Sequence, residues 1–127
     1  MPKIEVSVGE LVDKITILEI KKDRIKDETK LCYIKEELEI LKGDMEKYDF
    51  PLELYERLLE INTELWDTED IIRSMEDNLT FGDEFIKHAR LDAILNDKRF
   101  LVKNEINSIS KSAIKEQKSY EGLYTAN

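Results

Sequence analysis

The stretch 54–79, LYERLLEINTELWDTEDIIRSMEDNL, decides the fold, because its apolar residues recur at alternating spacings of four and three. That spacing is a heptad pattern, and it predicts a long helix whose apolar seam packs on a partner helix. The seam consists of Leu54, Leu58, Ile61, Leu65, Thr68, Ile72, Met75 and Leu79. The rest of the chain is expected to supply the helices that cover this seam.

A second row of side chains runs beside the seam of this helix, at about 100° per residue. This inner polar row consists of Asn62, Trp66, Glu69, Arg73 and Glu76. Its position next to the seam predicts that polar side chains stand in the buried half of the helix. The acidic residues of the opposite face, among them Glu60, Glu64 and Asp67, are expected to face water.

The composition bounds the class of protein. A chain of 127 residues fits one domain, so residues 1–127 are predicted to form a single domain. The chain is 41% hydrophobic and 39% charged, with only four Gly and two Pro, which favours an all-α fold. The net charge of −9 repels phosphate backbones and anionic lipid. Nucleic acid and membranes are therefore not expected as partners.

The location is predicted from the cysteine content and the N-terminal sequence. Cys32 is the only cysteine, so an intrachain disulfide is excluded, and no Cys/His quartet is present for structural zinc. The opening MPKIEVSVGEL lacks the apolar run of a signal peptide. We therefore expect a cytoplasmic protein without a membrane span.

Start and stop signals predict the first two helices. After an extended arm over residues 1–6, Ser7 and Glu10 have the spacing of a capping box, which begins the first helix. Asp27 opens a stretch without apolar residues and is a candidate N-cap, so a break is predicted there, although one continuous helix to Tyr48 is the alternative. Pro51 ends the second helical segment and opens the third.

The turn at residues 78–83 separates the third helix from a fourth, which is expected to reach about Ile114. The inner face of the fourth helix is predicted to contain Phe81, Phe85, Leu91, Leu95, Val102, Ile106, Ile109 and Ala113. The fold prediction is an antiparallel bundle of about four helices over residues 7–115. Residues 116–127 are predicted to form a mobile tail, in which Tyr120 and Tyr124 can dock on the bundle.

Polar residues also interrupt the inner stripe of the fourth helix, and with the inner polar row they form the set of candidate ligand-binding residues. That set is Trp66, Glu69, Arg73, Glu76, His88, Asp92 and Arg99. In the interpretation that we favour, the set is a buried ionic network. Glu69, Arg73 and Glu76 have the i,i+4 and i,i+3 spacings at which side chains of one helix pair. Arg99 and Lys103 are expected to neutralise Asp92 or carboxylates of an adjacent helix. Such a network fixes helix register and needs no ligand.

The alternative interpretation is a metal site. Glu69, Glu76 and Asp92 are the candidate ligands, and the shortage of histidine would restrict them to Mg²⁺ or Mn²⁺. The Glu-x-x-His motif of di-iron bundles is absent from the sequence. This hypothesis would make the protein a metal-dependent hydrolase of a phosphorylated small molecule or nucleotide. No catalytic residue can be assigned, and no cofactor or bound metal is expected.

The opening GELVDKITILEIK at residues 9–21 resembles that of an uncharacterised family of small helical proteins from bacteria and marine phages. The resemblance continues through the chain in short motifs, namely Leu65-Trp66, Glu69-Asp70, Arg73, Phe81-Gly82-Asp83, Asn96-Asp97, Arg99, Ile106-Asn107 and Lys118-Ser119-Tyr120. The resemblance implies no established activity or cofactor. It also implies that some members are joined to sugar-transferase or helical-repeat regions, which favours an accessory role.

The function predicted from the sequence is therefore a non-catalytic helical interaction or accessory module, with the hydrolase as the alternative. Its partner is expected to be a second copy or another protein. Four apolar residues are predicted to lie on outward faces, a pattern typical of a contact surface. They are Ile17 and Ile20 on the first helix and Ile86 and Phe100 on the fourth.

Overall fold

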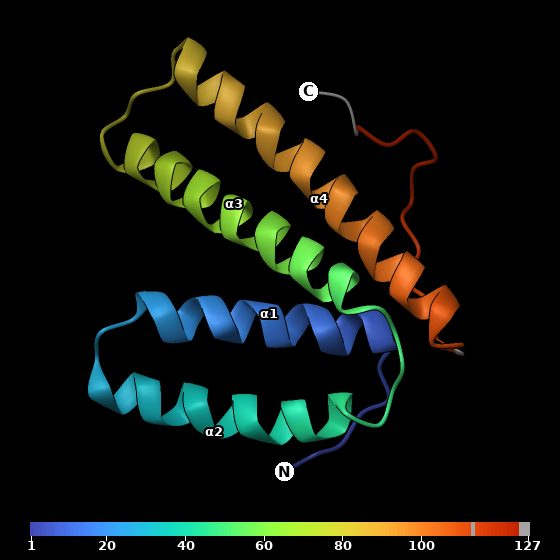
Figure 1. Cartoon of the computed structure of the whole chain (residues 1–127). Coiled ribbons are helices and arrows are strands. Elements are labelled where there is room, and N and C mark those ends of the chain that lie inside the picture. Colours follow the sequence, from blue (N-terminus) through green and yellow to red (C-terminus); the bar gives the residue numbers. More distant parts are fainter. Residues whose placement is uncertain (113, 125–127) are drawn as a thin grey trace.

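The computed structural model describes residues 1–112 and 114–124 and contains four helices (Figure 1). They are α1 (Val8–Arg24), α2 (Glu28–Met45), α3 (Leu52–Asp77) and α4 (Asp83–Ile109). Within the described residues there is no strand, so the all-α prediction is confirmed. Ala113, predicted on the inner face of the last helix, lies outside the described residues, as do residues 125–127 of the predicted tail.

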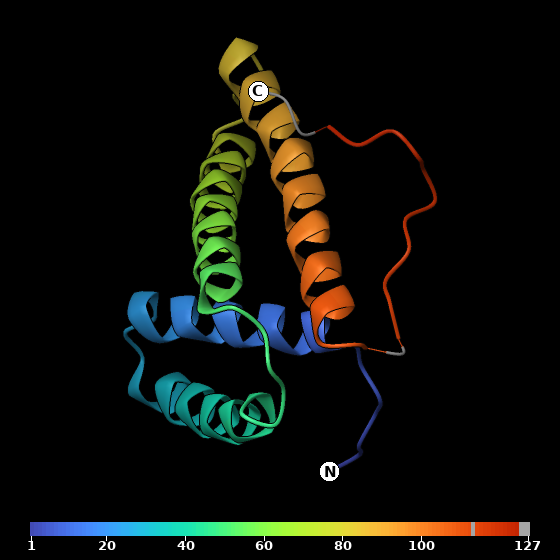
Figure 2. The ribbon, with the colours of Figure 1, turned by 45° about the vertical axis from the view of Figure 1, so that its right-hand side comes forward.

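The helices form two antiparallel hairpins, α1–α2 and α3–α4, and α1 lies between α2 and the α3–α4 hairpin (Figure 1). α1 packs on all three other helices, while α3 and α4 stand steeply across it on the side away from α2 (Figure 2). α1 is therefore covered on two sides. The predicted outward position of Ile20 is wrong, because this side chain is 5% exposed, and Ile17 is half-buried. On α4, Ile86 is exposed as predicted, whereas Phe100 is half-buried.

The predicted starts of the first two helices are confirmed. Ser7 Oγ accepts from the backbone N–H of Glu10 at 3.1 Å and caps α1. Asp27 Oδ1 accepts from the N–H of Lys30 at 2.9 Å and caps α2, so the chain breaks between the two helices as expected. In a complete capping box the Glu10 carboxylate would also accept from the N–H of Ser7. This bond is not seen among the described residues, because the Glu10 carboxylate accepts from Lys103 instead.

α3 ends in a Schellman motif without glycine. Thr80 N–H donates to Met75 O at 2.8 Å, Leu79 N–H donates to Glu76 O at 3.1 Å, and Leu79 is left-handed with φ of 54°. A left-handed conformation costs a residue with a side chain roughly 1–2 kcal/mol. The chain beyond α4 also turns through a left-handed residue, Lys111, with φ of 58°.

The predicted inner face of α4 is correct in the middle of the helix and wrong at its two ends. Leu95, Val102 and Ile106 are buried, as expected. Phe81 precedes the helix and Ile109 is its last residue, and both side chains are exposed because none of the described elements covers the ends of the helix. Since α4 stops at Ile109, it is also shorter than the predicted helix to about residue 114.

The α3–α4 hairpin has two regions, which we call the base and the tip. The base comprises residues 52–65 and 95–109, and its seam is buried against α1 in the larger core cluster. The tip comprises residues 68–92. None of the described residues from 66 to 90 belongs to a core cluster. In Figure 1 the tip projects beyond α1 at the end of the hairpin away from the N-terminus of α1.

Candidate functional site

A buried polar network joins α1 to the base. Its centre is the Asp13 carboxylate of α1, which is 1% exposed. Arg99 of α4 donates to it twice, from Nε to Oδ1 at 2.8 Å and from Nη2 to Oδ2 at 2.5 Å. Asn62 Nδ2 of α3 donates to Asp13 Oδ1 and to Thr16 Oγ1, both at 2.9 Å. One carboxylate thus fixes the relative positions of three helices.

The guanidinium at this centre is charged at neutral pH. The hydrogen bond from Arg99 to Asp13 raises the pKa of Arg99 above its ordinary value, although burial opposes the shift. The bidentate geometry of a guanidinium on a carboxylate makes the contact directional. A buried pair of this kind contributes modest net stability, but loss of one partner leaves the other charge uncompensated. The network therefore specifies how α4 sits on α1.

Gly9 and Asn107 bring the N-terminus of α1 against α4. Gly9 N–H donates to Asn107 Oδ1 at 2.6 Å. A Cβ on Gly9 would lie 2.4 Å from the Lys103 carbonyl oxygen and 2.9 Å from Asn107 Oδ1. Such distances are too short for carbon, so only glycine permits this approach of the two helices.

Lys103 continues the network toward the C-terminal tail. Its side chain is 7% exposed, and Nζ donates to Glu10 Oε2 at 2.8 Å and to Glu116 Oε1 at 2.6 Å. Burial lowers the pKa of Lys103, but the hydrogen bonds to the two carboxylates outweigh it and leave the pKa raised. For Glu116, burial raises the pKa and the bonds from Lys103 and Lys118 outweigh it, so the pKa is lowered. Lys103 and Glu116 are therefore both charged at pH 7.

A second buried carboxylate lies under the tail. Asp97 of α4 is 2% exposed. Tyr120 Oη donates to Asp97 Oδ1 at 3.0 Å, and the N–H of Tyr124 donates to Oδ2 at 2.5 Å. The bond to Asp97 raises the pKa of Tyr120. Docking of the tail was therefore anticipated for Tyr120, whereas Tyr124 docks through its backbone.

The inner polar row is buried only in part. Asn62 is 5% exposed and belongs to the network, but Glu69, Arg73 and Glu76 are exposed, so their predicted burial is wrong. The reason is the position of α1, which crosses the base and leaves the tip uncovered (Figure 2). Arg99 is half-buried, and it neutralises a carboxylate of an adjacent helix as predicted.

Glu69 and Asp92 form a carboxyl pair where the base meets the tip. Glu69 is exposed as a whole, but partial desolvation of its carboxyl group, followed by the charge and hydrogen bond of Asp92, raises the pKa of Glu69. Asp92 Oδ1 is buried and has no hydrogen-bond partner among the described residues. Because protonated Glu69 can donate to this oxygen, the pair favours holding one proton between α3 and α4.

The remaining candidates are separate from the network. His88 Nδ1 lies 2.7 Å from the carbonyl oxygen of Glu84 in its own helix, and Trp66 is half-buried. Glu76 lies two helical turns beyond Glu69. Within the described residues, no group of three or more His, Cys, Asp or Glu side chains is placed to hold a metal ion. The structure thus does not assemble the three proposed metal ligands.

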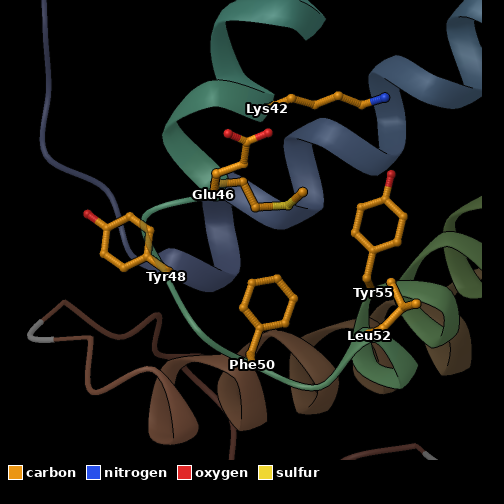
Figure 3. Close-up of a pocket in the computed structure, with 7 residues that line it drawn as sticks. Lys42, Glu46, Tyr48, Phe50, Leu52 and Tyr55 are labelled. Carbon is orange, nitrogen blue, oxygen red and sulfur yellow. The ribbon is translucent and has the colours of Figure 1, made fainter.

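A hollow lies elsewhere, between the end of α2 and the start of α3 (Figure 3). It has a volume of about 410 Å³ and is lined by Lys42, Met45, Glu46, Tyr48, Phe50, Leu52 and Tyr55. Lys42 is already paired with Glu19 of α1. Burial raises the pKa of Tyr55, so its phenol is neutral at pH 7. The lining is therefore mainly apolar and aromatic.

Sequence reasoning missed the α1 side of the network. Glu10, Asp13 and Thr16 are three residues apart and share one face of α1, next to Gly9. This spacing was the available signal, but the polar residues considered as a possible site were those of the third and fourth helices. In the structure, residues from the short motifs that carry the family resemblance bond to one another: the N–H of Gly9 donates to Asn107, and Tyr120 donates to Asp97.

These features define a small all-α protein whose helical hairpins are joined by a buried ionic network. The chain belongs to the family of unknown function DUF6165, whose model matches residues 2–126. No curated protein and no solved structure is significantly similar to it. Among the described helices, none combines the length and apolar character required to span a bilayer.

Proposed function

We propose that the protein is a non-catalytic interaction module that associates with a second copy of itself through the tip. The observation that carries this proposal is the exposure of apolar side chains on a two-helix segment. Leu79, Phe81 and Ile86 are 75%, 50% and 54% exposed. Met75 and Phe85 of the same segment are only half-buried. Two tips related by a two-fold axis would form four helices around one seam, as in helical bundles.

The backbone of Leu79 supports a contact role for the tip. A glycine would adopt φ of 54° without steric cost, whereas this leucine bears the cost and presents its side chain to solvent. Strain of this kind is associated with functional positions. The side chain of Leu79 is therefore suited to insertion into a partner surface.

Charge sets the conditions under which two copies associate. The chain has a net charge of −9, and the tip includes Glu69, Asp70, Glu76 and Asp77. Two approaching tips repel each other at low ionic strength. The Debye length falls from about 30 Å at 0.01 M salt to about 8 Å at 0.15 M. Self-association is therefore expected to strengthen with salt, because the apolar contact then outweighs the weakened repulsion.

The proposal includes a cytoplasmic location. Cys32 is free and exposed, and thiols of this kind persist in reducing compartments. A role as a small cytoplasmic oligomer is consistent with the absence of any established activity in the family.

The test is light scattering of the wild-type chain at 50 mM and 500 mM NaCl. We expect a mass above that of one chain, and a larger dimer fraction at the higher salt. Ile86→Ser should shift the chain to monomer with its helical content unchanged. The matched control is Ile40→Ser on α2, because Ile40 is 52% exposed and Ile86 is 54% exposed. A monomeric wild type at both salts, or equal loss of dimer in both variants, would exclude the tip as a self-association surface.

A further inference from the structure

A small cavity lies at the C-terminal half of α4, on the opposite end of this helix from the tip. It has a volume of about 130 Å³ and is lined by Asn96, Arg99, Phe100, Lys103, Glu116 and Lys118. Three of these side chains are cationic, and the one anion, Glu116, comes from the irregular tail. Without Glu116 the lining would be wholly neutral or positive.

Glu116 is held in this cavity as a small oxyanion would be held. Its Oε1 accepts from Lys103 Nζ at 2.6 Å, and its Oε2 accepts from Lys118 Nζ at 3.0 Å. Lys103 approaches from the buried side with 7% of its side chain exposed. Lys118 also stands over the ring of Phe100, with Nζ 5.8 Å from the centroid. The two ammonium groups thus span both oxygens of one carboxylate.

The cavity has three cationic side chains, but the helices supply carboxylates for only two of them. Arg99 is matched by Asp13, and Lys103 is matched by Glu10. Glu116 therefore adds a second carboxylate to Lys103, together with a partner for Lys118. Glu116 reaches the cavity from a segment without helix or strand, so it resembles a ligand tethered to the protein. A free oxyanion can compete with it for the same cations.

We propose that this cavity is a binding site for a compact oxyanion, a phosphate monoester or a carboxylate, which replaces Glu116 between Lys103 and Lys118. The volume admits a single charged group. Displacement of Glu116 replaces one contact of the tail with α4, while Lys118 of the same tail binds the oxyanion and Tyr120 and Tyr124 stay docked on Asp97. This inference does not rest on the proposed self-association.

The test compares oxyanion binding to the full chain and to Glu116→Gln by amide NMR titration, at pH 7 and constant ionic strength. Inorganic phosphate and acetate are used separately, so that the preferred oxyanion is distinguished. A short tether gives a competing group a millimolar effective concentration. Its removal should therefore tighten binding by about tenfold or more. Glu121→Gln is the matched control, since it removes one exposed acidic charge from the same tail and should bind as the wild type does.

Two further measurements make the result specific. Lys118→Gln should weaken binding in the Glu116→Gln background, and this partly exposed position leaves the core intact. In the wild type, saturation should leave hydrogen exchange of the Tyr124 amide unchanged, because the tail that carries Lys118 stays docked and this N–H still donates to Asp97. Absence of saturable binding of either anion to Glu116→Gln, or equal affinities of the Glu116→Gln and Glu121→Gln chains, would overturn the proposal.

Discussion

The base and the tip of the α3–α4 hairpin share one heptad seam but differ in what covers it. At the base, α1 adds a third helix, and Leu58 and Ile106 are fully buried. At the tip, the corresponding seam residues Met75 and Phe85 are half-buried. The difference shows that periodicity identifies the face on which two helices meet. It does not identify whether a further element seals that face.

Polar residues beside this seam show the same contrast. At the base, Asn62 is buried and Arg99 is half-buried, and both donate to Asp13. Arg73 and Glu76, which follow Asn62 along the same row, are exposed. A buried polar group must be hydrogen-bonded, whereas an exposed one is satisfied by water. Variants that alter equivalent residues in the two regions therefore test the comparison directly.

The largest expected effect is at the centre of the network. Arg99→Ala leaves the Asp13 carboxylate buried without its cation and should lower the free energy of unfolding by about 3–5 kcal/mol. Arg73→Ala, at an exposed position of the tip, should lower it by about 0.5 kcal/mol or less. Urea denaturation of both variants measures the difference. Equal losses would contradict the distinction between base and tip.

A double variant separates charge from packing in the same network. Asp13→Leu with Arg99→Met removes both charges and fills the space with apolar groups. It should be more stable than Arg99→Ala alone, because no unpaired charge remains. A double variant that is less stable than the single one in urea denaturation would show that the network stabilises the fold rather than specifying its register.

Gly9→Ala is expected to have the next largest effect. The added Cβ would lie 2.4 Å from the Lys103 carbonyl oxygen, so α1 and α4 must separate. We expect a loss of about 2–3 kcal/mol, which is typical of forced overpacking. Gly43→Ala is the control, because no atom lies within 4 Å of the added Cβ in α2. It should stabilise the chain by about 0.5–1 kcal/mol through helix propensity, and melting curves of both variants suffice.

The sequence predicted the helices better than their arrangement. Caps at Ser7 and Asp27 and the heptad seam are local signals, and the structure contains each of them. The crossing of the two hairpins depends on Gly9, whose role becomes visible only with α4 beside it. A helical wheel describes one helix at a time, so it cannot place the edge of α1 along α3.

The candidate site was predicted only in part for the same reason. Arg99 and Lys103 were expected to neutralise carboxylates, and they do so on α1. Asp13 was not among the candidate residues, which lay on the third and fourth helices. Its burial is explained by Arg99, which α4 brings against it. Pairing between distant elements is therefore the information that periodicity lacks.

A smaller effect is expected at the turn of the tip. Leu79→Gly removes the steric cost of the left-handed residue and should stabilise the folded chain by about 1 kcal/mol. The same variant should weaken self-association, because it also removes an exposed apolar side chain. Lys111→Gly is the matched control, since Lys111 has nearly the same φ just beyond α4. It should stabilise the monomer similarly and leave the dimer fraction unchanged in light scattering.

The smallest expected effect concerns the Glu69–Asp92 pair at the boundary of the two regions. Burial and the neighbouring Asp92 raise the pKa of Glu69 in the folded state. The folded chain then holds this proton more tightly than the unfolded chain, in which the pKa is about 4.3. Its stabilising effect is complete below that value and is lost as the pH rises through the raised folded pKa.

Glu69→Gln retains a donor for Asp92 Oδ1 at every pH and removes the like-charge repulsion. At pH 7 it should therefore stabilise the chain, by about 0.5 kcal/mol because the side chain is partly solvated. Below about pH 4 the variant and the wild type should converge, since the wild-type carboxyl is then protonated too. Glu76→Gln, two turns along the exposed row, is the control. Melting temperatures from pH 3 to 8 decide the matter, and a pH-independent difference between Glu69→Gln and the wild type would show that Asp92 does not share a proton with Glu69.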